Sequence, residues 1–159
     1  MKKALIIGGV ITLLFIIALI IVSSVSAEKY PLVNEYNDEI TIYRTGSCGC
    51  CKVYGTYFQN KGNKNVKTIE QDDITNIKEQ YGVPSSMESC HTTIIGEYFV
   101  EGHIPLEAIE KLLKESPDIK GIAMPGMPIG SPGMPGTKKE PFVVYAVTSS
   151  GSIEEFMRI

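Results

Sequence analysis

The fold follows from residues 40–62, ITIYRTGSCGCCKVYGTYFQNKG. The segment begins with alternating apolar and polar side chains from Ile40 to Arg44, which predicts a β-strand. Residues 50–61 then place aromatic and apolar side chains at helical spacing and are followed by Gly62, which predicts a helix. Cys48 precedes this helix, and Cys50 and Cys51 begin it. The segment is therefore predicted to be a strand followed by a helix with cysteine side chains at its N-terminus.

The chain after this segment continues the alternation of strands and helices. Residues 66–69 are predicted to form a short strand. A helix is expected to begin after Asp72 or Asp73 and to end at Gly82, because these residue types cap helices at those positions. Its apolar positions are Ile74, Ile77 and Tyr81.

A hairpin and a third helix come next. Residues 93–95 and 98–100 are predicted strands joined by Gly96-Glu97, and glycine at the first position of a two-residue loop favours a type II′ turn. Residues 105–116 begin with proline, carry leucine and isoleucine on one face and pair Glu with Lys on the other, which predicts a helix. A closing hairpin is expected over residues 142–148 and 153–157.

A long loop separates that helix from the closing hairpin. Residues 121–136 contain Pro-Gly-Met-Pro twice, at 125–128 and 132–135. Proline and glycine at this density exclude a helix or a central strand, so a Gly/Pro/Met loop is expected. The predicted order is strand, helix, strand, helix, two strands, helix, loop, two strands. This order indicates the α/β class, with a thioredoxin-like mixed sheet and flanking helices over residues 39–159.

The N-terminus is predicted to insert into a membrane. Residues 4–22 are uncharged and form, as a helix, a rod about 28 Å long, close to the thickness of the hydrocarbon layer. Lys2 and Lys3 are expected to stay in the cytoplasm, so the rest of the chain lies on the outer side. Residues 1–27 are thus either a single-pass transmembrane anchor or a signal, and cleavage after Val25-Ser26-Ala27 gives a secreted or periplasmic protein. Residues 28–38 are interpreted as a linker.

The net charge of the chain argues against nucleic acid as a partner. It holds 18 acidic and 15 basic residues, and two of the basic ones precede the apolar segment. An acidic domain does not release counterions from nucleic acid, so nucleic-acid binding is not expected.

The cysteines predict a thiolate site. Cys48 and Cys51 form a Cys-x-x-Cys pair at a helix N-terminus, where unpaired amides and the helix dipole stabilise thiolate. In a thioredoxin-like fold, Cys90 and His91 face this turn. Cys48, Cys50, Cys51 and Cys90 therefore gather as soft ligands, which suits Cu(I), including a site with several ions. Structural disulfides are a weaker interpretation, because a Cys48–Cys51 bridge closes only a tiny loop.

Other side chains are candidates for additional ligands or for positions beside the site. Thioether sulfur is a soft ligand, and Met124, Met127 and Met134 are expected to be exposed in the long loop. An alternative is that these methionines cover apolar surface. His91 is a candidate because it follows Cys90 directly. His103 is a weaker candidate, and an alternative role for it is to stabilise the start of the following helix.

Four motifs in order resemble the CopG-type copper-resistance family, a thioredoxin-like family of metal-binding proteins outside the cytoplasm. They are Cys48-Gly49-Cys50-Cys51, Met87-Glu88-Ser89-Cys90-His91-Thr92, Tyr98 with Glu101-Gly102-His103-Ile104-Pro105, and residues 121–134. The resemblance covers about residues 39–158 and implies that the four cysteines are copper-binding thiolates. Two departures stand out: the family's loop more often has an aliphatic residue at position 124, and no equivalent of the thioredoxin cis-proline precedes the strand after Cys90.

We therefore expect an exported, membrane-anchored protein that holds Cu(I) for copper resistance or homeostasis, with copper redox activity and a copper- or electron-accepting partner left open. No catalytic residue is assigned. The alternative is a thiol–disulfide oxidoreductase in which Cys48 attacks and Cys51 resolves. Zinc or another thiophilic metal in the same ligands is a third hypothesis.

Overall fold

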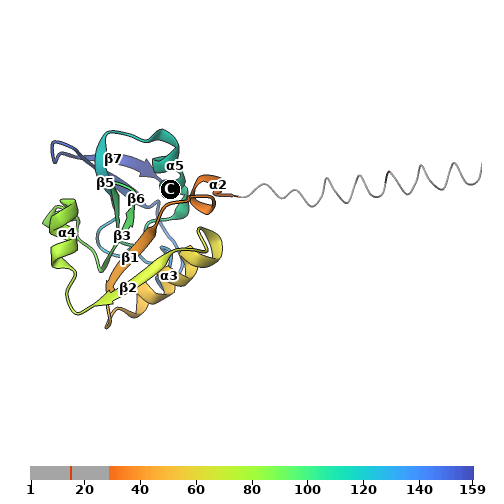
Figure 1. Ribbon diagram of the computed structural model, residues 1–159, viewed down its shortest axis with the longest axis horizontal. Coiled ribbons are helices and arrows are strands. Elements are labelled where there is room, and N and C mark those ends of the chain that lie inside the picture. Colours follow the sequence, from red (N-terminus) through yellow and green to blue (C-terminus); the bar gives the residue numbers. More distant parts are fainter. Residues whose placement is uncertain (1–14, 16–28) are drawn as a thin grey trace, which may run out of the picture.

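The strand and helix of residues 40–62 form as predicted. In the computed structural model, which describes residue 15 and residues 29–159, β1 covers Ile40–Thr45 and α3 covers Gly49–Lys61. β2 (Lys67–Gln71) follows and pairs with β1 in parallel, as a strand returning after a helical crossover must. Figure 1 shows α3 lying against this part of the sheet.

The predicted elements downstream are also confirmed. They are α4 (Thr75–Tyr81), β3 (His91–Ile95), β4 (Tyr98–Glu101), α5 (Leu106–Glu115), β6 (Val143–Thr148) and β7 (Ile153–Arg158). Gly82 ends α4 in the left-handed conformation, as its position at the helix end predicted. A short 3₁₀-helix, η1 (Ser85–Met87), lies between α4 and β3.

The prediction that residues 121–136 contain no strand is wrong at its beginning. Ile119–Ala123 form β5, a central strand parallel to β4 and antiparallel to β6. No proline falls in this strand, and Gly121 fits it because the strand passes very close to Phe99. A Cβ atom at position 121 would lie only 2.6 Å from Phe99 Cγ. The proline-rich loop therefore begins after residue 123.

The sheet has seven strands in the order β2-β1-β3-β4-β5-β6-β7. β1 and β3 are antiparallel, as are β3 and β4 and the β6–β7 hairpin. The fold is a mixed α/β domain with helices flanking this sheet, in agreement with the predicted class.

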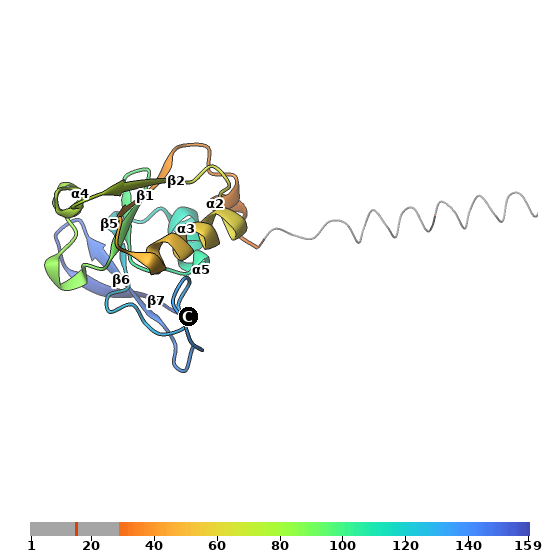
Figure 2. The ribbon, with the colours of Figure 1, turned by 90° about the horizontal axis from the view of Figure 1, so that it is seen from below.

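The two faces of the sheet carry separate apolar cores. Consecutive residues of a strand point to opposite faces, so Ile95 and Ile94 belong to different clusters. The larger cluster joins the sheet to Tyr54 and Phe58 of α3 and to the apolar residues of α5. The smaller cluster packs under Tyr81 at the end of α4. Figures 1 and 2 show α4 on the opposite side of the sheet from α3 and α5.

Part of the segment interpreted as a linker packs onto the domain. α2 (Pro31–Asn34) lies within residues 28–38, and its Val33 side chain is buried. The backbone amides of Leu32 and Val33 donate to the Glu110 carboxylate on α5, at 3.1 and 3.0 Å. Asn63 adds a hydrogen bond to the Val33 carbonyl. The chain is thus tied to the domain from about Tyr30 onward.

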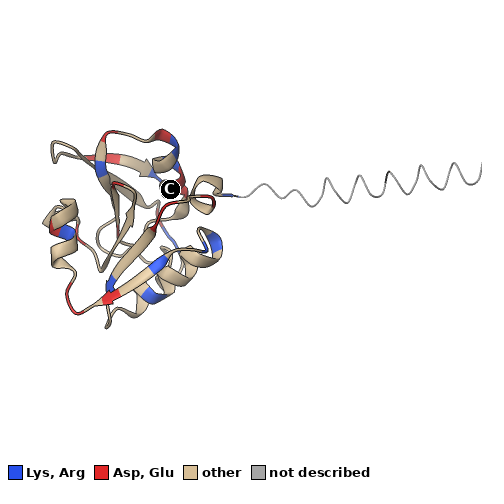
Figure 3. Ribbon diagram, viewed as in Figure 1, with Lys and Arg blue, Asp and Glu red and all other residues tan. Residues whose placement is uncertain are grey.

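The predicted transmembrane segment falls within residues 1–27, which lie outside the described residues except for residue 15. Among the residues that the structure describes, no helix combines the length and the apolar character needed to cross a bilayer. Basic and acidic residues are interspersed along the described ribbon (Figure 3).

Candidate metal centre

The first turn of α3 positions three of the four cysteines. Cys48 is the N-cap residue in extended conformation, and its sulfur accepts a hydrogen bond from the Cys51 amide at 3.3 Å. Cys50 and Cys51 are in the first helical turn, where Cys51 is fully buried and Cys50 is partly exposed. The Cys48 and Cys50 sulfurs are 3.6 Å apart. The strand-to-helix turn therefore presents three sulfurs at one helix end.

Cys90 joins them from the loop before β3. The sulfurs of Cys48, Cys50, Cys51 and Cys90 all lie within 4.8 Å of one another. The prediction that Cys90 and His91 face the Cys48–Cys51 turn is confirmed. Since β1 and β3 are neighbours, the C-terminal end of β1 and the N-terminal end of β3 meet at one edge of the sheet.

Both histidines lie at the same place. Cys51, Cys90, His91 and His103 form a second group whose ligand atoms lie within 4.8 Å of one another. The Cys90 sulfur is 3.3 Å from Nε2 of His103 and 3.6 Å from Nδ1 of His91. His103, the weaker candidate in the sequence, therefore contacts the cysteine cluster directly.

Tyr54 is the residue of this site that the sequence did not single out. Its ring lies 4.5 Å from the His91 ring and 5.5 Å from the His103 ring, centroid to centroid. Its hydroxyl donates to the Ile104 carbonyl at 2.9 Å. Tyr54 stands one helical turn after Cys51, and this spacing is the signal that places it on the same face of α3.

His91, His103 and Cys51 are fully buried, whereas Cys48, Cys50 and Cys90 are partly exposed, and this burial sets the protonation of the site. Burial lowers the pKa of His91 well below its usual range, helped by neighbouring His103 and Lys78, and burial also lowers the pKa of His103. Both imidazoles are therefore neutral at pH 7 and hold a free lone pair. Burial, together with nearby Cys50, raises the pKa of the Cys90 thiol to about 11.

Cys48 and Cys51 form a disulfide in this structure, with Cα atoms 5.4 Å apart, while Cys50 and Cys90 are free thiols. A Cys-x-x-Cys pair across one helical turn brings its two sulfurs close enough either to form a disulfide or to bind the same metal ion. Because the ligand form of cysteine is the thiolate, this bond must be reduced before Cys48 and Cys51 hold a metal ion.

The long loop lies against the site. The Pro132 carbonyl is 2.6 Å from Nδ1 of His103. Gly133 packs onto the first turn of α3, where a Cβ atom would lie 2.8 Å from the Tyr54 amide nitrogen and 3.0 Å from the Cys50 carbonyl oxygen. Residues 132–133 therefore bridge α3 and His103.

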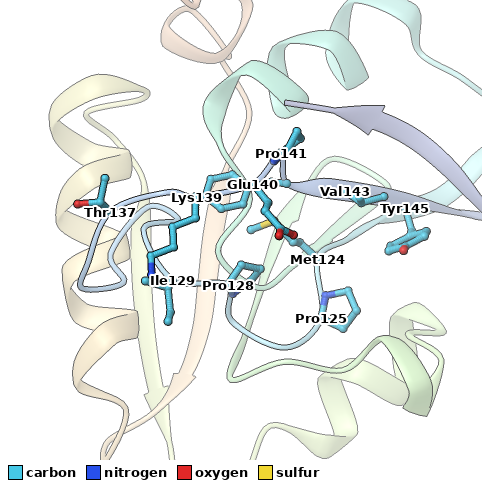
Figure 4. A pocket seen from close by; sticks show the side chains of 11 residues that line it. Met124, Pro125, Pro128, Ile129, Thr137, Lys139, Glu140, Pro141, Val143 and Tyr145 are labelled. Carbon is cyan, nitrogen blue, oxygen red and sulfur yellow. The ribbon is translucent and has the colours of Figure 1, made fainter.

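The methionines of the loop differ in exposure. Met127 is 39% exposed and Met134 is half-buried, but Met124 is only 1% exposed and belongs to the main core. The expectation that Met124 is exposed is wrong, because β5 carries the chain directly into the core before the loop begins. Met124 also lines a hollow of about 510 Å³, shown in Figure 4, together with Pro128, Ile129 and Lys139. None of the four cysteines lines this hollow.

The donor set fits a soft metal ion. Four sulfurs and two neutral imidazoles converge, and Nε2 of His91 is buried without a hydrogen-bond partner among the described residues. A buried imidazole nitrogen without a hydrogen-bond partner destabilises the fold unless its lone pair binds a metal ion. Soft sulfur donors favour Cu(I), and imidazole suits copper as well as zinc.

Comparisons with known proteins identify a matching family model and two similar structures. The family model described as "Protein of unknown function, DUF411" matches residues 87–134. Two solved structures, named "Copper resistance protein copG- Form 1" and "Copper resistance protein copG- Form 2", are similar to this chain at 37% and 39% sequence identity. Each covers 76% of this chain; 96% and 97% of their own chains are covered, with TM-scores of 0.65 and 0.68. No curated protein matches.

Proposed function

Because the chain belongs to the CopG-type copper-resistance family, we propose that it holds Cu(I) in a thiolate site made by Cys48, Cys50, Cys51 and Cys90. A copper-related role is supported by the similarity to two copper resistance proteins and by a cysteine cluster able to hold a metal ion. The single observation that carries the proposal is the convergence of four sulfurs within 4.8 Å.

The residues of the chain have separate tasks in this proposal. The reduced cysteines supply thiolates as soft ligands for the copper, and α3, β3 and the loop shield Cys51 and the two histidines from water. His91 and His103 are additional ligands or hold the cysteines in place. Cys90 releases its proton on binding, because its thiol carries that proton at neutral pH in the absence of metal. Bound copper supplies one-electron redox chemistry, which opens transfer of electrons or copper to a partner protein.

We also propose a thioredoxin-like fold, an extracytoplasmic location and a role in copper resistance or homeostasis. The order β2-β1-β3-β4, with β1 parallel to β2 and antiparallel to β3, supports the fold assignment. Lys2 and Lys3 before an uncharged stretch support a single-pass anchor or a signal that directs the domain to the outer side.

The test replaces the cysteine that a simple dithiol mechanism does not need. Cys50→Ser in the full chain, reduced and loaded with Cu(I) without oxygen, is expected to retain much less copper than the unmodified chain. Val53→Ser is the matched control, because Val53 is 55% exposed on the same helix. Unchanged copper stoichiometry in Cys50→Ser would contradict the proposal.

The disulfide favours a second candidate function, a thiol–disulfide oxidoreductase that uses Cys48 and Cys51. In that reaction the Cys48 thiolate attacks a substrate disulfide, and Cys51 resolves the mixed disulfide to give the bond seen here. Reductase or isomerase activity that survives the loss of both Cys50 and Cys90 would favour it over copper binding.

A further inference from the structure

A buried ion pair lies beside the loop that carries Cys90. Lys78 of α4 donates to the Glu101 carboxylate at the end of β4, and their side chains are 6% and 0% exposed. Every other ion pair found in residues 29–159 has at least one partner more than a third exposed. Removing two charges from water costs several kcal/mol per ion, and a well-packed apolar pair is often equally stable. Stability alone is therefore a weak reason for this pair.

The Glu101 carboxylate accepts hydrogen bonds from two further groups near Cys90. The Ser89 backbone amide donates to Oε1 at 2.5 Å, and the Thr92 hydroxyl donates to Oε2 at 2.6 Å. Lys78 also donates to the Thr92 hydroxyl at 3.0 Å. Burial raises the pKa of Glu101, and the cationic Lys78 opposes this effect. The carboxylate thus joins α4, β3, β4 and the loop that carries Cys90.

The backbone of Cys90 is held on both sides by this arrangement. On one side, Ser89 is bound through its amide to Glu101. On the other, the His91 carbonyl accepts from the Gly102 amide at 3.1 Å. Between these two anchors, the Cys90 sulfur lies 3.3 Å from His103 and within 4.8 Å of the other three sulfurs. Displacement of Ser89 would move this sulfur away from them.

We propose that Glu101, charged and oriented by Lys78, is a positioning residue that fixes the Ser89–Cys90 backbone and so places the Cys90 sulfur in the cluster. The importance of this position for copper rests on the function proposed above. The placement itself does not depend on copper and is tested without metal.

The test compares two double variants of the metal-free, full-length chain in detergent. Lys78→Met with Glu101→Leu removes both charges together and leaves the Ser89 amide without its acceptor. Lys78→Met with Glu101→Gln also removes both charges but keeps an oxygen that accepts from this amide. With the Cys48–Cys51 disulfide intact, iodoacetamide labels only Cys50 and Cys90, and mass spectrometry gives the ratio of their labelling rates.

We expect the leucine variant to raise the rate of Cys90 labelling relative to Cys50 about tenfold, because loss of a hydrogen bond to a charged group shifts a local opening equilibrium by this order. The glutamine variant is expected to raise this ratio much less, because its amide oxygen still accepts from the Ser89 amide, although without the charge. Lys67→Met with Glu39→Leu is the matched surface control, since it removes an exposed Lys–Glu pair in which the glutamate also accepts from a threonine. This control is expected to leave the ratio unchanged.

A second pair of variants serves if the leucine variant does not fold. Ser89→Pro removes the amide donor while Lys78, Thr92 and Glu101 remain paired, and Glu88, at φ −61° and ψ 144°, already has the conformation that proline requires of its predecessor. Ser89→Ala keeps the donor. Faster Cys90 labelling in Ser89→Pro alone supports the proposal. Equal labelling in both, or a folded leucine variant with an unchanged ratio, overturns it. A chain that binds no copper but shows these labelling changes refutes only the proposed function.

Discussion

Nδ1 of His103 lies 2.6 Å from the carbonyl oxygen of Pro132. A carbonyl only accepts hydrogen bonds, so Nδ1 carries the proton and Nε2 is left with a free lone pair. That nitrogen faces the Cys90 sulfur at 3.3 Å. One contact from the long loop therefore fixes the tautomer of a histidine in the cluster.

This relationship predicts how two substitutions of His103 affect copper binding. Asparagine keeps a donor near the position of Nδ1 and loses the nitrogen that faces Cys90, whereas glutamine places an amide near Nε2 and loses the contact with Pro132. Groups that hydrogen-bond to a metal-ligating side chain and orient it raise the affinity for the metal by about tenfold to a hundredfold. If Nε2 is a ligand, neither amide replaces it for Cu(I), so His103→Asn weakens Cu(I) binding strongly even though it keeps a donor to Pro132, as measured by competition with a chromogenic chelator. Binding weakened by His103→Gln but not by His103→Asn would indicate that His103 acts only through the loop.

Gly133 is predicted to be essential for the packing of the loop. Gly133→Ala would place a methyl group 2.8 Å from the Tyr54 amide nitrogen, so the loop must move. Gly126→Ala is the matched control in the same loop, because both glycines have φ near +80° and nothing lies within 4 Å of a Cβ atom at position 126. We expect Gly133→Ala to lower the free energy of unfolding by at least about 1 kcal/mol more than Gly126→Ala. Urea titration followed by circular dichroism measures this, since the chain has no tryptophan. Equal losses would mean that the loop does not pack closely on α3.

The stability of the metal-free chain is predicted to fall as the pH decreases below about 6.5. The native pKa values of His91 and His103 are lowered by burial, so in this range the unfolded chain binds protons that the native chain does not. The stabilisation that comes from these neutral histidines is fully present at a pH above their pKa in the unfolded chain. It is lost progressively as the pH falls toward their lowered pKa in the native chain. The raised pKa of Glu101 acts in the opposite direction, because the native chain then binds the extra proton.

The contribution of His91 is therefore measured as a difference. Between pH 7.5 and 5.5 the unmodified chain is expected to lose about 1 kcal/mol more free energy of unfolding than His91→Asn. The same slope in both chains would contradict the assignment of His91 as a buried, neutral imidazole.

The sequence predicted most elements of this fold because their signals are local. The apolar face of α5, the glycine that ends α4 and the alternation in β1 depend on neighbouring residues only. β5 was missed because Gly121 is explained by the approach of Phe99, a residue of another strand. Met124 was expected to be exposed for the same reason, since its burial follows from the unpredicted strand.

The candidate site was predictable to a similar depth. The four cysteines and His91 could be placed together from the position of each at the end of a strand or the start of a helix. His103 and Tyr54 enter through packing between elements, and Lys78 and Glu101 have the residue types of ordinary surface charges. A buried ion pair between α4 and β4 depends on how the two elements pack, which no periodicity along the chain reveals.

Copper binding by the four cysteines is tested most directly by the amount of copper that the reduced chain retains. The full-length chain is reduced and loaded with Cu(I) without oxygen, and bound copper and free thiols are then counted by elemental analysis and thiol titration. We predict more than one copper ion per chain, with the thiols of Cys48, Cys50, Cys51 and Cys90 all protected. A chain that retains no copper, and in which Cys48 and Cys51 only cycle between dithiol and disulfide, would contradict copper binding by this cluster.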